Sequence, residues 1–431
     1  MNLHVEPVDS IDGRVLLPSS KSYTIRAFLI AACGGISKLV NPSDSDDCLV
    51  AKKVAVALGV SINRTSHNTF VIKADLHKKI PKRINVGESG TVLRFILPLL
   101  CLRSADCTVT GEGTLRNRPN TFLIRTLKSM GARIEGRGST HCVPIRIKKS
   151  RLKGGHIEID GSLSSQFISA LLMTCPLVNE DTELSIRGKL VSETYITMTR
   201  QILSLAGIKL DARGSQYFFI KGRQIYRGLK NFCVPSDYGL AAFFLAAAAL
   251  LRSDVELIGD FQDDFIQSDG QILPFLKRMG VRWTKTPKKI RIHGPFQLKG
   301  GNFSLRDCPD LVPIMAILAL FAQGRTRLLD IGHVRVKESD RIGDLKQELL
   351  KVGAKITDHP GALTIEPQPS YRSRVFLNPH HDHRLAMAFS ILGIKLAVSI
   401  KDIECCSKSY PGFVSDLKKL VGPHALRLKN V

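Results

Sequence analysis

The chain has 431 residues, with 62 Lys and Arg against 38 Asp and Glu, so its formal net charge at pH 7 is +24. A chain of this length exceeds one ordinary hydrophobic core, which predicts about two or three domains. A positive field of this strength gathers anions, so the composition leaves two classes of partner, nucleic acids and small polyanionic substrates.

The nucleic-acid interpretation depends on basic clusters such as residues 77–79 and 146–149. Aromatic residues make up only 6% of the chain, and none is interleaved with these clusters as a base-stacking ladder. Solvated strand faces explain the clusters more simply. We therefore expect a small-molecule substrate and no nucleic-acid partner.

The ten cysteines are scattered, with no CxxC pair and no His beside them at metal-ligand spacing. Thiols of a cytosolic protein are the simplest account of them. Residues 1–6 lack the charged and apolar regions of a signal peptide, and no apolar run is long enough to span a bilayer. We expect a soluble, cytoplasmic monomer without a membrane partner.

Six times along the chain a small or acidic polar residue opens a mostly apolar stretch, at intervals of roughly 73 residues. Six glycines follow the same period in a second phase, each after a helical pattern. Two markers that share one period predict six copies of one α/β unit. The polar starts are Ser20, Ser89, Ser164, Asp237, Asp310 and Asp382, and the glycines are Gly59, Gly131, Gly207, Gly280, Gly353 and Gly422.

Each unit reads as helix, strand, helix, strand and strand, with the second helix ending at its glycine. After Gly131, strand-like residues 132–134 and 143–147 flank a turn, and the other units echo this pattern. The first helices, such as 241–251 and 314–321, are apolar on nearly every side. This composition predicts helices that lie inside the protein, enclosed by sheets.

Six units divide most simply into two lobes of three. The strand-like segment 15–17 precedes the first buried helix, so we expect the N-terminus to complete a unit of the C-terminal lobe. Proline interrupts the pattern near positions 18 and 235, where the chain would cross between lobes. The predicted domains are 1–17 with 235–431, and 18–234. The predicted fold class is α/β, a two-lobed inside-out α/β barrel whose lobes could close on a ligand.

Hydroxyl and basic side chains cluster at the predicted helix starts of the N-terminal half. Residues 18–26 combine hydroxyl groups and unpaired backbone N–H groups with a lysine and an arginine, which predicts an anion site. The start at 87–94 has glycines that let a ligand approach the backbone, and the start at 161–167 offers neutral hydrogen-bonding groups. Between them, 111–119 is a loop with two arginines. A capped surface helix remains the alternative for each start alone.

The C-terminal half contributes cation-rich segments at 336–341, 381–384 and 407–411. Arg341 and Arg384 could each bind a carboxylate with a bidentate guanidinium, a geometry that lysine cannot reproduce.

Asp310 and Glu338 are the carboxylates placed among these cations, which favours a general base and a general acid, with salt-bridged surface pairs as the alternative. His381 and His383 have a spacing that could ligate a metal in a strand. At a helix start without acidic partners, we expect no metal there.

In order and spacing, these motifs resemble the signatures of the 5-enolpyruvylshikimate-3-phosphate synthase family from about Pro18 to Pro411. The resemblance implies two lobes, each of three βαβαββ units, with helix N-termini facing an active site in the interlobe cleft. It also implies transfer of the enolpyruvyl group of phosphoenolpyruvate to the 5-hydroxyl of shikimate 3-phosphate, in the pathway to chorismate and the aromatic amino acids. No metal or organic cofactor is implied. The matching segments are Ser20-Lys21-Ser22 with Arg26, Ser89-Gly90-Thr91 with Arg94, 115–119, 160–167, 192–195, 336–341 and 382–384.

By resemblance, Asp310 would accept the proton of the attacking hydroxyl, while Glu338 and Lys21 would manage protonation of the methylene carbon. The reaction would be an addition and elimination through a tetrahedral intermediate, whose charges suit carboxylates beside cations. Gly90 would leave room for phosphoenolpyruvate and for the inhibitor glyphosate. The residues implied for phosphoenolpyruvate are Lys21, Gly90, Arg118, Arg341, Arg384 and Lys408. Those implied for shikimate 3-phosphate are Ser22, Arg26, Ser164, Ser165, Gln166, Ser192, Tyr195, Asp310 and Lys337.

Three positions depart from the family pattern or have no fixed role in it. Glu88 stands where the family usually has Asn, and its negative charge would oppose anion binding unless a cation such as Arg94 neutralises it. His333 stands where many members have Asn near the shikimate ring, and His383 has no role that the resemblance fixes.

The nearest competitor is the enolpyruvyl transferase family that acts on a UDP-linked amino sugar and shares the six-unit fold. That family typically has a reactive Cys in the loop corresponding to 111–119, and this loop has none. Its N-terminal lysine is followed by Asn, where this chain has Ser22. Both differences favour the first family.

Overall fold

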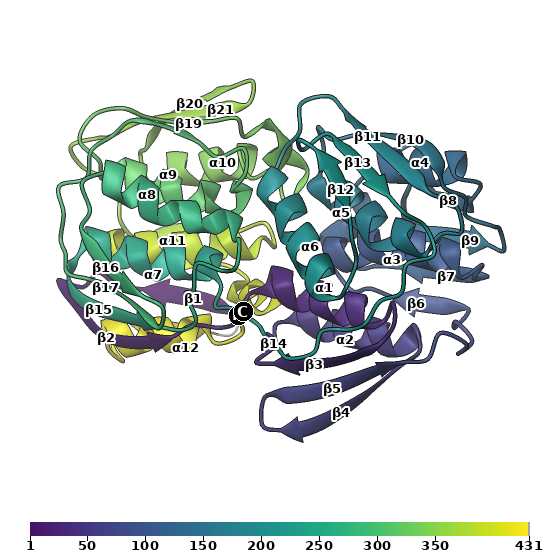
Figure 1. The fold of residues 1–431 in the computed structure, drawn as a ribbon. Helices are drawn as coiled ribbons and strands as arrows, with labels where there is room; N and C mark the ends of the chain where they lie inside the picture. Colours follow the sequence, from purple (N-terminus) through teal and green to yellow (C-terminus); the bar gives the residue numbers. More distant parts are fainter. Residues whose placement is uncertain (430–431) are drawn as a thin grey trace. The chain divides into compact units, whose positions relative to one another are not determined.

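The computed structural model describes residues 1–429, and the chain divides into two compact units (Figure 1). The N-terminal unit is Ser19–Val234, and the C-terminal unit joins Met1–Pro18 to the chain from Pro235 onward. Each unit has three sheets of four strands, in which one parallel pair is extended by two antiparallel strands. The predicted six-fold α/β repeat is confirmed.

The sheets of the N-terminal unit share this arrangement. In strand order the first is β14 (Phe232–Cys233), β3 (Ile36–Val40), β5 (Thr69–Ala74) and β4 (Val60–Ser66). The second is β6 (Arg83–Asn85), β7 (Cys107–Thr110), β9 (Cys142–Lys148) and β8 (Arg133–Arg137). The third is β10 (Gly155–Asp160), β11 (Thr182–Arg187), β13 (Tyr217–Ile220) and β12 (Asp211–Arg213).

The sheets of the C-terminal unit repeat the pattern. The first is β16 (Trp283–Thr286), β17 (Lys289–Ile292), β15 (Arg252–Ile258) and β2 (Ser10–Leu16). The second is β18 (Asn302–Ser304), β19 (Thr326–Leu329), β21 (Ala362–Glu366) and β20 (Lys355–His359). The third is β22 (Val375–Leu377), β23 (Val398–Ile400), β1 (Asn2–Val5) and β24 (Leu426–Lys429).

Two strands join a sheet other than the one their position in the chain suggests. Strand β2 leads into the first helix of the N-terminal unit, yet it pairs in parallel with β15 of the C-terminal unit. Strand β14 leads into the first helix after Pro235, yet it pairs in parallel with β3 of the N-terminal unit. The C-terminal unit is thus completed by β2 from the N-terminal end of the chain, and the N-terminal unit by the last strand of its own segment.

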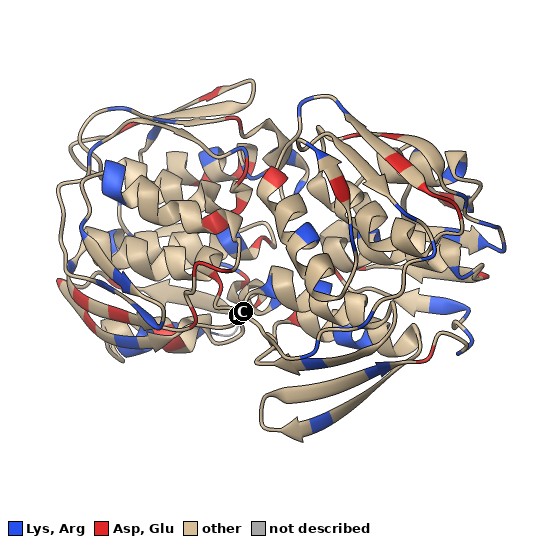
Figure 2. Ribbon diagram, in the orientation of Figure 1, with Lys and Arg blue, Asp and Glu red and all other residues tan. Residues whose placement is uncertain are grey.

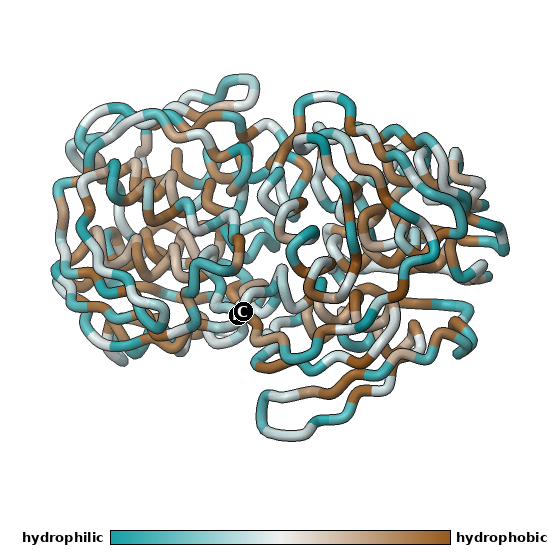
Figure 3. The backbone as a smooth tube through the Cα atoms, in the orientation of Figure 1, coloured by the Kyte–Doolittle hydropathy of each residue, from teal (hydrophilic) through white to brown (hydrophobic). Residues whose placement is uncertain are grey.

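The first helix of each repeat lies inside its unit, as predicted. Every residue of α7 and of α9 is buried, and both helices pack against α11 (Figure 3). In the N-terminal unit, α3 packs against α1 and α5. These six helices are α1 (Lys21–Ala31), α3 (Gly90–Leu102), α5 (Ser165–Thr174), α7 (Tyr238–Leu250), α9 (Val312–Leu320) and α11 (His383–Leu396).

The second helix of each repeat ends at its glycine. All six glycines have φ between +85° and +106°, the left-handed region in which a side chain at a helix end is disfavoured. The prediction that these six glycines end the second helices of the repeats is therefore confirmed. These helices are α2 (Asp46–Ala57), α4 (Thr121–Ser129), α6 (Glu193–Leu205), α8 (Ile272–Arg278), α10 (Gly343–Lys351) and α12 (Phe413–Val421).

Many charged residues lie on the outer faces of the sheets. Figure 2 shows Lys and Arg in blue and Asp and Glu in red along the strands. Arg146 and Lys148 alternate with buried residues along β9, and Glu256 on β15 pairs with Arg14 and Lys289 at 2.9 Å each. Within residues 1–429, no helix combines the length and the apolar character needed to cross a bilayer.

Candidate functional site

Five of the six polar helix starts cap the helix that follows them. The side chains of Ser20, Ser89, Ser164, Asp237 and Asp382 each accept a hydrogen bond from a backbone N–H two or three residues further on. Such caps satisfy one donor and leave other N–H groups of the first turn available to a ligand. The sixth, Asp310, lies in a 3-10 turn, η4 (Pro309–Leu311), and α9 begins after it without a side-chain cap.

Arg26 organises the start of α1. Its Nε donates to Thr199 Oγ1 at 2.8 Å, Nη1 to the carbonyl of Ser22 at 3.0 Å and Nη2 to the carbonyl of Tyr195 at 3.2 Å. The guanidinium also lies over the Phe95 ring, 5.1 Å from its centroid. Burial lowers the pKa of Arg26 to about 10, so it remains a cation at neutral pH. The structure thus brings Ser22, Arg26 and Tyr195 together.

Lys21, at the first position of α1, is half-buried and pairs with Asp47 of α2, with 3.2 Å between Nζ and Oδ2. The Asp47 side chain is only 7% exposed. This pair holds the lysine at the helix start, where the helix dipole also favours anions.

A second contact group joins α3 to α5. Arg94 Nη1 donates to Gln166 Oε1 at 2.6 Å, and Gln166 Nε2 donates to Thr91 Oγ1 at 2.9 Å. Gly90, beside Thr91, lies against the buried Arg118: a Cβ added at Gly90 would be 2.7 Å from Arg118 Nη1. Gly90 therefore makes room for the guanidinium of Arg118 in this chain.

The carboxylate of Glu88 packs against Gly113, the first residue of the 3-10 segment η1 (Gly113–Asn117). Arg94 bonds Gln166, Asn120 and the carbonyl of Pro119. Neutralisation of Glu88 by Arg94 stays a prediction.

In the C-terminal unit, one guanidinium meets three carboxylates. Arg341 Nε pairs with Asp382 Oδ2 at 2.7 Å, Nη1 with Asp310 Oδ1 at 2.7 Å and Nη2 with Glu338 Oε2 at 2.9 Å. The Arg341 side chain is 1% exposed and that of Asp382 is fully buried. Burial lowers the pKa of Arg341, but the three carboxylates outweigh this effect and hold it well above its usual value.

Asp310 links this group to the second arginine. Its Oδ2 accepts from Arg384 Nη2 at 3.0 Å, while Arg384 Nη1 donates to the carbonyl of Gly239 at 2.7 Å. The Asp310 side chain keeps 20% exposure, although both arginines are almost fully buried. Two fixed cations and one accessible carboxylate therefore meet at a single point.

Two buried titratable groups flank the arginines. Burial, and after it the charge of Asp310, raises the pKa of Asp269 to about 7, while Arg384 acts in the opposite direction. Burial, and after it the charges of Lys337 and Arg341, lowers the pKa of His333 to about 3. His333 is therefore neutral and lies in the same electrostatic environment as Lys337, Arg341 and Asp310.

The remaining predicted residues occupy element starts or ends. Ser164 caps α5, Ser165 is its first residue, and both are buried. Ser192 precedes α6 in the left-handed conformation, with φ of 55°. Lys408 is buried at the end of the 3-10 segment η6 (Ile403–Lys408), and His383 is buried as the first residue of α11.

Sequence reasoning missed the partners that hold these cations. Asp47 pairs with Lys21. Burial lowers the pKa of Arg384, but the charge of Asp269 helps to raise it. Both aspartates lie far along the chain from the motif concerned, and nothing in their local sequence marks them. Asp382 was recognised as a helix start and as part of a motif, but its second contact, with Arg341, was not. Among the described residues 1–429, no group of three or more His, Cys, Asp or Glu has the arrangement of a metal site.

Comparisons with known proteins agree with one another. Residues 5–417 match the family model described as EPSP synthase (3-phosphoshikimate 1-carboxyvinyltransferase). A 3-phosphoshikimate 1-carboxyvinyltransferase of Photobacterium profundum is 35% identical over 98% of this chain and 99% of its own length. One from Methanosarcina mazei is 37% identical over 95% of this chain and 96% of its own length.

Solved structures show the same fold at lower identity. An EPSP synthase from Acinetobacter baumannii superposes with a TM-score of 0.80 at 24% identity, covering 100% of both chains. The enolpyruvyl transferase NikO from Streptomyces tendae superposes with a TM-score of 0.77 at 17% identity, covering 99% of this chain and 98% of its own.

Proposed function

Because the chain belongs to the EPSP synthase family, we propose specific roles for its clustered cations and carboxylates in enolpyruvyl transfer. The enzyme transfers the enolpyruvyl group of phosphoenolpyruvate to shikimate 3-phosphate in the shikimate pathway. Both substrates are multiply charged anions. The surplus of basic residues and the cations at the helix starts suit such substrates.

The observation that carries the assignment is the group of Asp310, Arg341 and Arg384. Each oxygen of Asp310 accepts one hydrogen bond from a buried guanidinium, at 2.7 Å and 3.0 Å. The Asp310 side chain keeps 20% exposure, so a substrate hydroxyl can reach its carboxylate. Asp310 is therefore suited to accept the proton of the attacking hydroxyl of shikimate 3-phosphate.

The two arginines would bind the carboxylate of phosphoenolpyruvate, and Lys21, Arg118 and Lys408 would bind its phosphate. A guanidinium already fixed by protein carboxylates needs little reorganisation when a substrate arrives, which favours stabilisation of the transition state. Glu338, 2.9 Å from Arg341, would exchange a proton with the methylene carbon, assisted by Lys21. Addition and elimination through a tetrahedral intermediate would follow.

Shikimate 3-phosphate would bind the groups gathered at α1, α5 and α6, with Lys337 in addition. Arg26 supports this role indirectly, because its bonds tie Ser22 to Tyr195 and Thr199. Gln166, held by Arg94 and Thr91, presents a preoriented amide. The residues assigned to this substrate are Ser22, Arg26, Ser164, Ser165, Gln166, Ser192, Tyr195, Asp310 and Lys337.

Release of inorganic phosphate tests the reaction. We expect phosphate only when both substrates are present, and none when either is omitted. For the variant Asp310→Asn, which should lower the rate of phosphate release, Asp254→Asn is the matched control, because Asp254 is 46% exposed on β15 and pairs with Arg291. Phosphate release with a UDP-linked amino sugar in place of shikimate 3-phosphate would overturn the proposal.

We also propose that the enzyme acts as a monomer in a reducing compartment. All ten cysteines are free thiols, a pattern typical of cytosolic proteins. Sedimentation of the purified chain at the mass of one copy, 47.5 kDa, is the expected result. A mass of two copies at enzyme concentrations used for assays would contradict it.

A further inference from the structure

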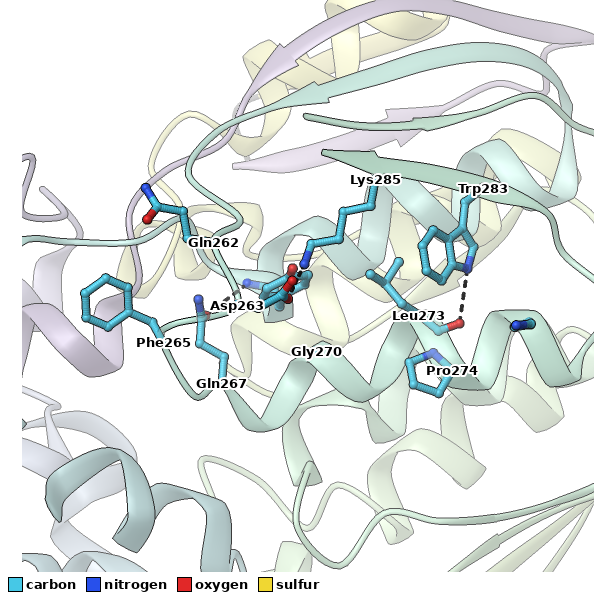
Figure 4. Close-up of a pocket in the computed structure, with 11 residues that line it drawn as sticks. Gln262, Asp263, Phe265, Gln267, Gly270, Leu273, Pro274, Trp283 and Lys285 are labelled. Carbon is cyan, nitrogen blue, oxygen red and sulfur yellow. Dashed lines mark hydrogen bonds and ion pairs between the residues drawn. The ribbon is translucent and has the colours of Figure 1, made fainter. Parts of the chain in front are cut away.

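A cavity of about 510 Å³ lies in the C-terminal unit among the loop after β15, the helix α8 and the strand β16 (Figure 4). Its volume falls within the roughly 300–1,000 Å³ typical of small-molecule sites. None of its lining residues is among the groups assigned to the two substrates. The lining comprises Tyr238, Gln262, Asp263, Phe265, Gln267, Gly270, Leu273, Pro274, Lys277, Trp283 and Lys285.

The walls combine apolar surface with two ammonium groups. Trp283 and Lys285 are two positions apart on β16, so both side chains leave the same face of the strand. The Trp283 indole donates to the carbonyl of Leu273 at 3.2 Å, which fixes the ring beside α8. Lys277 is exposed on α8 and forms no ion pair within residues 1–429.

The cavity contains one carboxylate, and that group can be displaced. Asp263 pairs with Lys285, but the Asp263 side chain is 93% exposed. The Lys285 side chain is only 16% exposed, so the solvated Asp263 is the partner that would move away, and a ligand carboxylate could replace it at Lys285. Tyr238 offers a further donor, because burial raises the pKa of its phenol and keeps it protonated.

We propose that this cavity binds a small aromatic carboxylate. A flat ring would lie against Trp283 and Tyr238, where offset or edge contacts between aromatic rings are favourable. Its carboxylate would meet Lys285 in place of Asp263, and Lys277 would add to the positive field of the cavity. A phosphate ester without an apolar body, such as phosphoenolpyruvate, would leave Leu273, Pro274 and the indole uncovered.

The cavity is also linked to the arginine that we assign to phosphoenolpyruvate. Gln267 accepts from the backbone N–H of Tyr238 at 3.3 Å and donates to the carbonyl of Ser236 at 2.7 Å. The next residue, Gly239, accepts from Arg384 at 2.7 Å. Occupancy of the cavity would therefore shift the backbone that supports Arg384 and change the KM for phosphoenolpyruvate. This second step depends on the proposed function, whereas binding itself does not.

The chain's single tryptophan gives a direct measurement of occupancy. Benzoate titrated into the full-length protein should change Trp283 fluorescence saturably, and neutral benzamide should bind much more weakly. Lys285→Gln should weaken benzoate binding about tenfold, the size of one charge-assisted hydrogen bond. Lys288→Gln, an exposed lysine outside the cavity, should leave the affinity unchanged.

Three results would overturn the site: no saturable fluorescence change, equal affinity for benzamide, or unchanged affinity in Lys285→Gln. Tighter binding of ATP than of benzoate would overturn the ligand class. In kinetic assays benzoate should alter the KM for phosphoenolpyruvate in the unaltered enzyme and much less in Lys285→Gln. Binding without any change in KM would overturn the link to Arg384, and it would leave the assigned reaction intact.

Discussion

The contact between Gly90 and Arg118 allows a quantitative test of the phosphoenolpyruvate site. A Cβ at position 90 would lie 2.7 Å from Arg118 Nη1 and 2.8 Å from Cζ, whereas ordinary contact begins at 3.4 Å. In Gly90→Ala the guanidinium must therefore retreat by about 0.7 Å, the difference between 3.4 and 2.7. A displacement of about 1 Å of a group in a binding site can lower the rate by up to about 100-fold.

We expect the KM for phosphoenolpyruvate to rise about tenfold in Gly90→Ala, with a much smaller change for shikimate 3-phosphate. The fold should tolerate the methyl group, because the obstructing atoms end a flexible side chain and alanine favours a helix over glycine by about 1 kcal/mol. Initial rates of phosphate release give both constants, and thermal unfolding checks the fold. Gly301→Ala is the matched control, since its Cβ would meet nothing closer than 3.6 Å.

A double-mutant cycle isolates the cause. Lysine at position 118 lacks the guanidinium that the new methyl would meet, so Gly90→Ala should add little to the effect of Arg118→Lys. Fully additive effects of the two substitutions would refute the steric explanation. An unchanged KM for phosphoenolpyruvate in a folded Gly90→Ala enzyme would remove Arg118 from the phosphate site.

Three further outcomes test the C-terminal unit. Arg341→Met should lower the free energy of unfolding by about 3–5 kcal/mol in denaturant titrations, because three carboxylates lose their shared cation; a loss below about 1 kcal/mol would show that the cluster tolerates its absence. Asp310→Asn should lower kcat by roughly 10²–10⁴-fold while calorimetry still detects shikimate 3-phosphate, and near-normal turnover would remove Asp310 from the base role. Burial depresses the pKa of His333 to about 3 and raises that of Asp269 to about 7. Between pH 4.5 and 6 only the unfolded chain protonates His333, which costs stability as the pH falls, whereas only the folded chain protonates Asp269, which adds stability. Compared with the unaltered chain, the urea midpoint should therefore fall less between neutral and acidic pH in His333→Asn, and fall more in Asp269→Asn. A variant whose pH profile matches that of the unaltered chain would contradict the pKa assigned to that residue.

Local patterns predicted much of the fold because the repeat depends on local chemistry. A left-handed residue at a helix end favours glycine regardless of its neighbours, so Gly131 and Gly353 could be recognised from the sequence alone. The enclosed helices α7 and α9 were similarly visible in their composition. The pairings of β1 with β23 and β24 were not predicted, since a short strand carries no signal for its partners.

For the candidate site too, the sequence did not predict contacts between residues that are distant in the chain. Motifs indicated the cations and carboxylates that we propose for the chemistry, but not the groups that hold them in place. Asp47 lies 26 residues from Lys21, and Asp382 lies 41 residues from Arg341, so their contacts exist only once the helix starts are assembled.

Asp310 does not follow the capping pattern of the other five polar helix starts, and it is also the residue proposed as the base. Its counterparts cap their helices, and losing such a cap costs about 1 kcal/mol. Helix α9 begins instead with Val312 and Pro313. Proline has no N–H, so one of the donors that a cap would satisfy is absent. Asp310 is thereby released from capping, and its two oxygens meet Arg341 and Arg384. Because departures from local consistency tend to concentrate at functional sites, the one repeat that lacks a capping side chain is the repeat in which the base is expected.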